Sequence, residues 1–225
     1  MKNILKSAVA AGFLLSVAPL GAATATAQVA GIATADPSIV IAGSKARDAA
    51  YRQINQTYSA QITQLRQLET EMNGIKQKLD KNGDKQVDQQ EYDSNPNVVQ
   101  QMEAKQQQIA QTGQPIVLAQ YYAIEQLIND YSNARDEVVK AKKISIILQP
   151  QSIQYAPDSV DVTADIIAAV DKRLPTVSTA VPAGWKPRRE TVEIHQAVQQ
   201  LMVAAAAQQR ASEGQQASGP ATSGR

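Results

Sequence analysis

The sequence is poor in the residues that most enzyme chemistry needs. Its 225 residues include no Cys, one His (His195), one Trp and one Phe, and aromatic residues make up 4% of the chain. The lack of Cys excludes disulfides, thiolate metal sites, a lipid-modified N-terminal Cys and a Cys nucleophile. No Gly-rich phosphate loop, Ser/His/Asp set or HExxH motif is present. The sequence therefore predicts a protein that is not an enzyme and requires no cofactor.

Long apolar runs are also rare. The one extended run, residues 8–20, is too short to span a bilayer, follows two lysines and precedes the small-residue sequence Ala25–Ala27. This order of features predicts a secretory signal peptide over residues 1–27, cleaved near Ala27. An uncleaved membrane anchor is the alternative. We expect an exported protein that works in the periplasm.

The chain is close to electrically neutral. Its net charge is +1, and a near-neutral chain is not expected to bind nucleic acid. A small basic patch of Lys186, Arg188 and Arg189 follows Trp185. The patch is either part of a solvated linker or a site that touches a membrane surface or an acidic partner. Membrane contact is therefore expected to be transient at most.

What the sequence has in abundance is helical periodicity, from residue 44 to residue 143. In the first half, apolar residues recur at steps of three or four: Tyr51, Ile54, Tyr58, Ile62, Leu65, Leu68, Met72, Ile75 and Leu79. A second stripe follows a polar turn at residues 80–96: Val98, Met102, Ile109, Ile116, Ala123, Leu127, Tyr131, Ala134, Val138 and Ala141. Such spacing is typical of a coiled-coil seam. At ~1.5 Å per residue the arms would be on the order of 50 and 65 Å long. We therefore expect a long antiparallel helical hairpin that projects into solvent.

The returning arm contains a weak point. Glutamines surround Ile109, and Gly113 and Pro115 follow closely. Proline lacks a backbone N–H and its ring clashes with the preceding helical turn. We therefore predict a kink or hinge at Gly113 and Pro115. A complete break of the helix is the alternative.

The residues before the hairpin predict the start of a small body. Residues 28–43 contain a short apolar strand at 32–35 and a brief helix after it. Asp36 followed by Pro37 is a helix-start pair, a capping side chain and then Pro at the first helical position. Ser44 is expected to cap the first long arm in the same way.

The residues after the hairpin predict the rest of the body, within 144–174. Residues 144–148 are rich in Ile, and residues 152–156 alternate between apolar and polar side chains. These patterns predict two strands joined as a β-hairpin. An amphipathic helix follows, opened by Asp161 or Thr163. The predicted fold class is α+β, with a coiled-coil-like helical hairpin projecting from a small β-strand body.

The character of the chain changes after Leu174. Residues 175–189 are rich in Pro and predict a linker. Residues 190–225 predict a short helix up to Arg210 and a disordered Ser/Gly/Gln-rich tail from Ala211. The sequence does not decide whether that helix docks on the body.

Together these segments resemble the Skp/OmpH family of periplasmic chaperones. The resemblance covers residues 31–174, and its most specific part is the series 144–148, 152–156 and 161–170. In that family the series is a strand, a strand with a Tyr near its end, and a helix opened by an Asp/Thr-x-x-Asp pattern. The hairpin inserted between the first and the later strands is the family's hallmark.

The resemblance implies an assembly and an activity. Family members are homotrimers whose strands build a central barrel and whose hairpins surround a cavity, where unfolded outer-membrane proteins are held without ATP. The residues expected at the oligomer interface are Ile144, Ile146, Leu148, Ile153 and Tyr155. Strands this short do not make a stable sheet alone, so pairing between copies would complete it.

The charge of the hairpin departs from the family pattern. Well-known members are strongly basic, whereas residues 44–143 here contain 13 Lys/Arg and 13 Asp/Glu. Long-range electrostatic steering of clients should therefore be weak. Clients would have to be held mainly by apolar contacts.

The turn at the end of the hairpin resembles a 12-residue EF-hand calcium loop. Oxygen-bearing residues occupy loop positions 1, 3, 5, 7, 9 and 12: Asp80, Asn82, Asp84, Gln86, Asp88 and Glu91. Lys85 stands at position 6, where Gly is usual because the turn needs a positive φ, and this would cost about 1–2 kcal/mol. A polar surface turn without metal is the alternative.

This loop carries the second functional hypothesis. Calcium bound weakly at the tip would tie the ends of the two arms together. The protein would then be a calcium-binding structural or scaffold protein of the cell envelope. The ion is not required for the chaperone hypothesis.

Overall fold

The structure, a computed structural model, describes residues 31–217, with side chains up to residue 213. The elements in chain order are β1 (Ile32–Thr34), α1 (Pro37–Gly43), α2 (Lys45–Thr57), α3 (Ser59–Leu79), α4 (Gln89–Ser94), α5 (Pro96–Lys142), β2 (Ile146–Leu148), the short 3₁₀ turns η1 (Pro150–Ser152) and η2 (Asp158–Val160), α6 (Thr163–Arg173) and α7 (Arg189–Ala217). The predicted signal peptide, residues 1–27, lies outside the described residues, as does the end of the predicted disordered tail.

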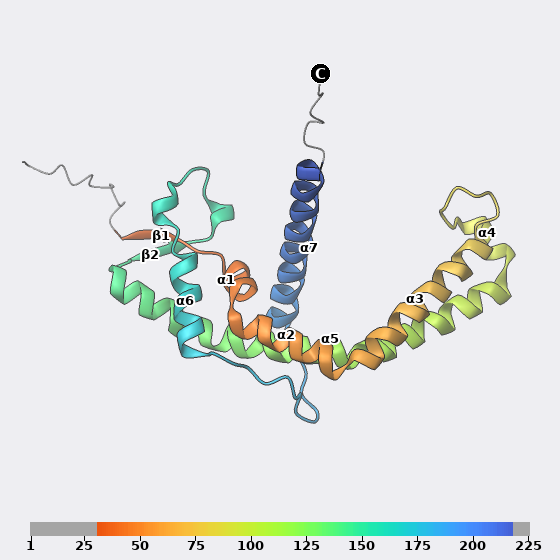
Figure 1. Cartoon of the computed structure of the whole chain (residues 1–225), viewed down its shortest axis with the longest axis horizontal. Helices are drawn as coiled ribbons and strands as arrows, with labels where there is room; N and C mark the ends of the chain where they lie inside the picture. The colour runs from red at the N-terminus through yellow and green to blue at the C-terminus, as the bar shows by residue number, and fades with distance from the viewer. Residues whose placement is uncertain (1–30, 218–225) are drawn as a thin grey trace, which may run out of the picture.

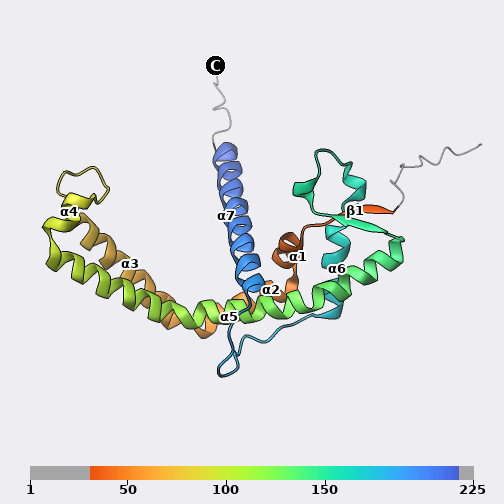
Figure 2. The ribbon, with the colours of Figure 1, turned by 180° about the vertical axis from the view of Figure 1, so that it is seen from behind.

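The molecule has the form of a bow with a body at one end and a tip at the other. Figure 1 shows β1, β2, α1 and α6 gathered at one end of α5, and α3 and α4 at the other. The arm curves beyond α2, and α7 rises on the inner side of the curve. Seen from behind, the segment between α6 and α7 crosses α5 on the side opposite to α7 (Figure 2). The long hairpin therefore projects from the body, and the C-terminal residues wrap around the hairpin's base.

The predicted capping residues start the first helices. The Asp36 side chain accepts hydrogen bonds from the backbone N–H groups of Ser38 and Ile39, with Pro37 at the first helical position. The Ser44 hydroxyl accepts one from the N–H of Arg47 and starts α2. Both caps satisfy backbone donors that a helix leaves unpaired at its N-terminus.

The sheet differs from the predicted β-hairpin. β2 pairs in parallel with β1, in the register Ile32 with Ile146 and Thr34 with Leu148. The crossover between them is the whole helical hairpin, which suits parallel pairing. The strand predicted at residues 152–156 is wrong, because Pro150 starts a 3₁₀ turn that leads the chain away from β2. Within the described residues the sheet has two strands, extended only by a single bridge between Thr34 and Asp161.

The outgoing arm is two helices rather than one. α2 ends at Thr57 and α3 begins at Ser59, with Tyr58 between them at φ −104° and ψ 23°. No sequence signal indicated this break, since the apolar stripe continues through Tyr58. Around it lies a small cluster of buried Ile54, Ile116 and Ala119, with Tyr58, Ile62, Leu65 and Val181 packed against it.

The returning arm, α5, is one helix of 47 residues with Pro115 inside it. The alternative of a complete helix break at Pro115 is therefore wrong. One missing N–H costs a single helical hydrogen bond, and Ile116 next to it is anchored in the cluster at Tyr58. Pro115 and the break at Tyr58 thus lie at the same level of the arm, where Figure 1 shows it curving.

We call the two parts of the hairpin the arm base and the outer arm. The arm base is α2 with residues 116–142 of α5, and it shares the core of the body, which includes Ile41, Ile124, Leu127 and Ile166. The outer arm is α3, α4 and residues 96–112 of α5. Its buried apolar residues form a single line: Leu68, Met72, Ile75, Leu79 and Val99. The outer arm is therefore only two helices thick.

The last helix is longer than predicted. α7 continues to Ala217, so residues 211–217 are helical and not disordered. Only its first turns are buried in the molecule, through Thr191, His195 and Val198. No helix of the described part of the chain is long and apolar enough to cross a membrane.

Candidate functional site

Of the five residues predicted at the oligomer interface, Ile146 and Leu148 lie in β2, whereas Ile144, Ile153 and Tyr155 lie outside the strands. Ile146, Leu148 and Tyr155 are 50%, 38% and 85% exposed. Ile144 and Ile153 are half-buried, and Ile144 packs against the core. The sequence analysis did not include Ile32, which pairs with Ile146 and is 38% exposed. Apolar side chains exposed on a two-stranded sheet make a surface suited to a protein partner.

Five of the six predicted calcium ligands lie in the loop between α3 and α4, and the sixth, Glu91, lies in the first turn of α4. The side chains of the first three accept hydrogen bonds from backbone N–H groups of the loop. The Asp80 carboxylate accepts hydrogen bonds from the N–H groups of Gly83 (2.7 Å) and Lys85 (2.9 Å). The Asn82 and Asp84 side chains accept bonds from the N–H groups two residues further on, at 2.8 and 2.7 Å. Lys85 has a φ of 67°, the left-handed conformation expected at loop position 6.

Glu91 holds the two ends of this loop together. One of its carboxylate oxygens accepts hydrogen bonds from the N–H groups of Lys81 (2.6 Å) and Asn82 (3.1 Å), and the other from that of Asp88 (3.3 Å). Asp88 in turn caps α4. Glu91 is 8% exposed. Both carboxylate oxygens of Glu91 therefore accept hydrogen bonds from the loop's own backbone. Within the described residues, no three acidic or His side chains form a group that could hold a metal ion. Calcium binding stays a prediction of the sequence.

The predicted hinge residues lie in the middle of α5, at the level of the buried cluster around Tyr58, and Gly113 faces α3. A Cβ atom added to Gly113 would lie 3.8 Å from a methyl carbon of Leu65 on α3, an ordinary contact distance. Pro115 lies next to Ile116 of the buried cluster. The structure therefore brings both residues to the bend, and movement there stays a prediction.

The sequence analysis missed the attachment of the C-terminal residues to the arm base. We call this attachment the C-terminal clasp and define it as residues 175–188 with the docked part of α7, residues 189–200. The amide of Gln126 on α5 donates to the carbonyl of Ser178 (2.9 Å) and accepts from its N–H (3.0 Å). The rings of Trp185 and Tyr122 meet edge to face at 5.2 Å. The linker predicted from its prolines is thus bound along α5.

Glu125 on α5 fixes the start of α7. Its carboxylate accepts hydrogen bonds from the Thr191 hydroxyl (2.6 Å) and the Arg188 N–H (3.2 Å). Burial alone would raise the pKa of Glu125, but these bonds and the charge of Arg188 outweigh it and hold the pKa below its usual value. Arg188 of the basic patch is therefore paired with α5, through Glu125 and Asn129.

His195 lies where α7 meets α5. Its Nε2 lies 3.2 Å from the side-chain oxygen of Gln120, and its ring meets the edge of Tyr121 at 4.7 Å. Burial lowers the pKa of His195, because the charged ring would lose its hydration. The spacing of Ile194, Val198 and Leu201 indicated a helix here, but no sequence signal indicated its docking partner.

The region from β1 to α6 matches a known protein family. The model of the family described as "Outer membrane protein (OmpH-like)" matches residues 31–170, from the start of β1 to the last turn of α6. The chain is a member of the OmpH family, as the resemblance of its body segments implied. The matched region ends before the C-terminal clasp.

Comparison with solved structures adds one related chain. A crystal structure of a protein from Caulobacter crescentus, described as "OmpH-like", is 20% identical, with 67% of this chain and 89% of that chain covered and a TM-score of 0.41. Comparison with curated proteins gives no match. Membership of the OmpH family supports a chaperone role.

Proposed function

We propose that the protein is an ATP-independent holdase of the periplasm, which holds unfolded outer-membrane proteins between the arms of a homotrimer. The proposal is supported by the family match and by one observation above all. The sheet has only two strands in the described part of the chain and leaves Ile32, Ile146 and Leu148 exposed. A sheet of this size is not stable by itself, and joining three copies through these residues would bury them.

The outer arm supports the holding role. Because it is two helices thick, apolar side chains at the border of its seam are only half-buried: Ile62, Leu65, Val98, Met102 and Ile109. Such a border offers many weak apolar contacts along the arm. Unfolded chains of varied sequence are held best by distributed contacts of this kind, without a shaped pocket.

The test of this function uses the mature chain and a variant of its sheet. Purified protein is expected to sediment as a trimer and to suppress the aggregation of an unfolded β-barrel protein at stoichiometric amounts without nucleotide. Ile146→Glu places a charge on the exposed sheet surface and should give a monomer with little holding activity. Val203→Glu is the matched control, because Val203 is 68% exposed on α7, far from the sheet.

Two outcomes would contradict the proposal. A wild-type monomer without effect on aggregation would exclude the trimeric holdase. A monomeric Ile146→Glu variant with full activity would show that holding does not need the cavity between arms.

A further inference from the structure

The surface beneath α7 is formed by three elements of the body and the arm base. α7 packs on α1 and α5. Tyr121 of α5 contacts the His195 ring, and the Arg47 guanidinium of α2 reaches the Met202 sulfur at 3.6 Å. The buried residues of α7, Thr191, His195 and Val198, are spaced by four and three along the helix. This is the spacing by which an amphipathic helix is bound in a groove.

The bonds that hold α7 on this surface are few after its first turn, and the charged group among them is the Arg47 guanidinium at Met202. Of the ion pairs recorded within residues 31–213, the one in α7 joins Arg189 to Glu193 of the same helix. Beyond the Thr191 bond, its polar contacts with α5 involve the neutral side chains of His195 and Gln120. From Leu201 to residue 213 the helix is almost entirely exposed. Docking therefore depends on one short stripe of residues: Thr191, Ile194, His195 and Val198. The bound linker would keep a released α7 close by.

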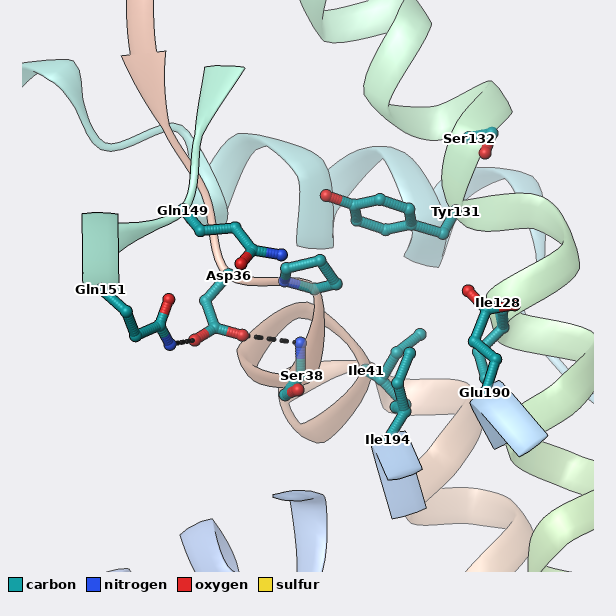
Figure 3. Close-up of a pocket in the computed structure, with 11 residues that line it drawn as sticks. Asp36, Ser38, Ile41, Ile128, Tyr131, Ser132, Gln149, Gln151, Glu190 and Ile194 are labelled. Carbon is teal, nitrogen blue, oxygen red and sulfur yellow. Dashed lines mark hydrogen bonds between the residues drawn. The ribbon is translucent and has the colours of Figure 1, made fainter. Parts of the chain in front are cut away.

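The docked helix leaves part of the surface unfilled. A cavity of about 340 Å³ lies beside the start of α7. Figure 3 shows apolar side chains at Ile41, Ile128 and Tyr131, with Ile194 contributed by α7. Polar side chains complete the lining: Asp36, Ser38, Ser132, Gln149, Gln151 and Glu190. A segment that carried a larger apolar or aromatic anchor than Ile194 would fill the space better than α7 does.

We propose that the groove between α1 and α5 is a second binding site for unfolded polypeptide, which α7 covers in cis and which a client segment with a large apolar anchor uncovers. The inference rests on the proposed holdase function. It adds a second site, which is covered by a helix that lies outside the region matching the family. Its place on the inner side of the bow puts it where a client held by the arms would meet it (Figure 1). The apparent affinity for clients is then the affinity of the open site multiplied by the fraction of molecules in which α7 is undocked.

The first experiment compares two lysine substitutions in the full mature chain. Val198→Lys places a charge on the fully buried face of α7, whereas Val203→Lys places the same charge on an exposed residue further along the helix. Fluorescence anisotropy measures the affinity for a labelled, unfolded fragment of a β-barrel protein. Val198→Lys should bind roughly threefold tighter or more, because the site is then open in most molecules. Val203→Lys should bind as the wild type does.

The second experiment needs no destabilising change. Hydrogen exchange of residues 189–200 is followed in the wild type with and without saturating client, and should become faster when the client is bound. The absence of Cys allows a unique pair, Gln120→Cys with His195→Cys, to be joined by a short bismaleimide. The joined protein should lose the client-induced exchange and bind the client more weakly than the same variant before joining.

The outcomes separate this inference from the proposed function. If the wild type binds no client, the holdase function fails and this site with it. Suppose that the wild type binds client, that Val198→Lys binds it with the wild-type affinity, and that client does not change the exchange of α7. The holdase function then stands and the second site is overturned. Faster exchange of α7 in the wild type supports the site even if Val198→Lys fails to fold.

Discussion

At the scale of single residues, His195 makes the docking of α7 sensitive to acid. Burial holds its folded pKa below the ordinary value of 6.5. The neutral ring is therefore favoured in the docked state, so docking is strongest above pH 6.5 and weakens as the pH falls through the folded pKa. Gln120 and Tyr121 face the ring from α5, and neither supplies a negative charge to stabilise the protonated form.

We expect acid to loosen α7 before it unfolds the body. Hydrogen exchange of residues 189–200, corrected for the intrinsic pH dependence of exchange, should lose protection between about pH 7 and about pH 5. His195→Gln cannot take up a proton, so its α7 should show the same protection at both values. Equal acid sensitivity in the variant would assign the effect to another group.

A second residue, Glu91, is expected to decide whether the tip is ordered. It is almost fully buried and accepts hydrogen bonds from three backbone N–H groups. Each bond to a charged acceptor is worth roughly 1.5–3 kcal/mol. Glu91→Ala should therefore remove the exchange protection of residues 81–88 and leave that of the arm base unchanged.

The control for the tip is Asp93→Ala. The Asp93 carboxylate accepts a hydrogen bond only from the exposed side chain of Gln89. Removing it should leave the tip protected. Loss of protection in both variants would mean that the charge of α4, and not the bonds of Glu91, orders the loop.

At the scale of elements, the bend of the arm is where the hinge can be tested. Proline inside a helix costs about 3 kcal/mol and glycine about 1 kcal/mol relative to alanine. Pro115→Ala and Gly113→Ala should each slow hydrogen exchange around residues 108–119, since a Cβ added at Gly113 meets only the end of Leu65. If bending is needed for holding, both variants should suppress aggregation less well.

Gly74→Ala provides the matched control for the bend. Gly74 lies in α3 of the outer arm, and a Cβ there would meet nothing within 4 Å. The substitution should stabilise the helix as Gly113→Ala does, but away from the bend, and should leave holding unchanged. A loss of holding in Gly74→Ala as well would assign the effect to helix stability in general.

The loop at the tip also tests the calcium prediction. If the ion binds as the sequence predicts, millimolar calcium should raise the melting temperature and slow exchange at residues 80–91. Asp84→Asn keeps an oxygen for the hydrogen bond from the Gln86 N–H but removes a charged ligand, so it should abolish the effect. Magnesium at the same ionic strength is the control, and an unchanged melting temperature in calcium would contradict the prediction.

The elements also show what the sequence could predict. The two arms and the caps at Asp36 and Ser44 followed from periodicity and from local chemistry, which act within a few residues. The partner of β2 did not, because parallel pairing with β1 is decided by residues that the whole hairpin separates along the chain. The break at Tyr58 could not be predicted for a similar reason, because Tyr58 packs against Ile116 and Ala119 of the other arm.

At the scale of the whole molecule, the chain divides into a family region and an addition. Residues 31–170 match the OmpH family and contain the sheet and the arm. The C-terminal clasp then binds the arm base up to the bend, where Val181 joins the cluster of Ile54 and Ile116. The described residues of the clasp thus cover the base and leave the outer arm uncovered. No sequence pattern predicted this, because docking depends on the shapes of two distant surfaces.

The neutral arm leads to a prediction about salt. Residues 44–143 carry equal numbers of acidic and basic side chains, and one ion pair, Lys105 with Glu71, joins α5 to α3 in the outer arm. Salt shortens the range of charge interactions from about 10 Å at 0.1 M to about 3 Å at 1 M. Because apolar contacts do not depend on this range, the affinity for an unfolded client should change less than about twofold between ~0.05 and ~0.5 M salt.

A positively charged arm is the control for that prediction. Glu69→Lys combined with Asp93→Lys changes two exposed acidic residues of the outer arm. This variant should bind an acidic client more tightly at low salt and lose the gain at high salt, because added charge acts by steering and screened attraction. The wild-type affinity, measured by the same titration, should stay nearly constant. A steep fall of the wild-type affinity with salt would show that local charge, despite the neutral total, holds the client.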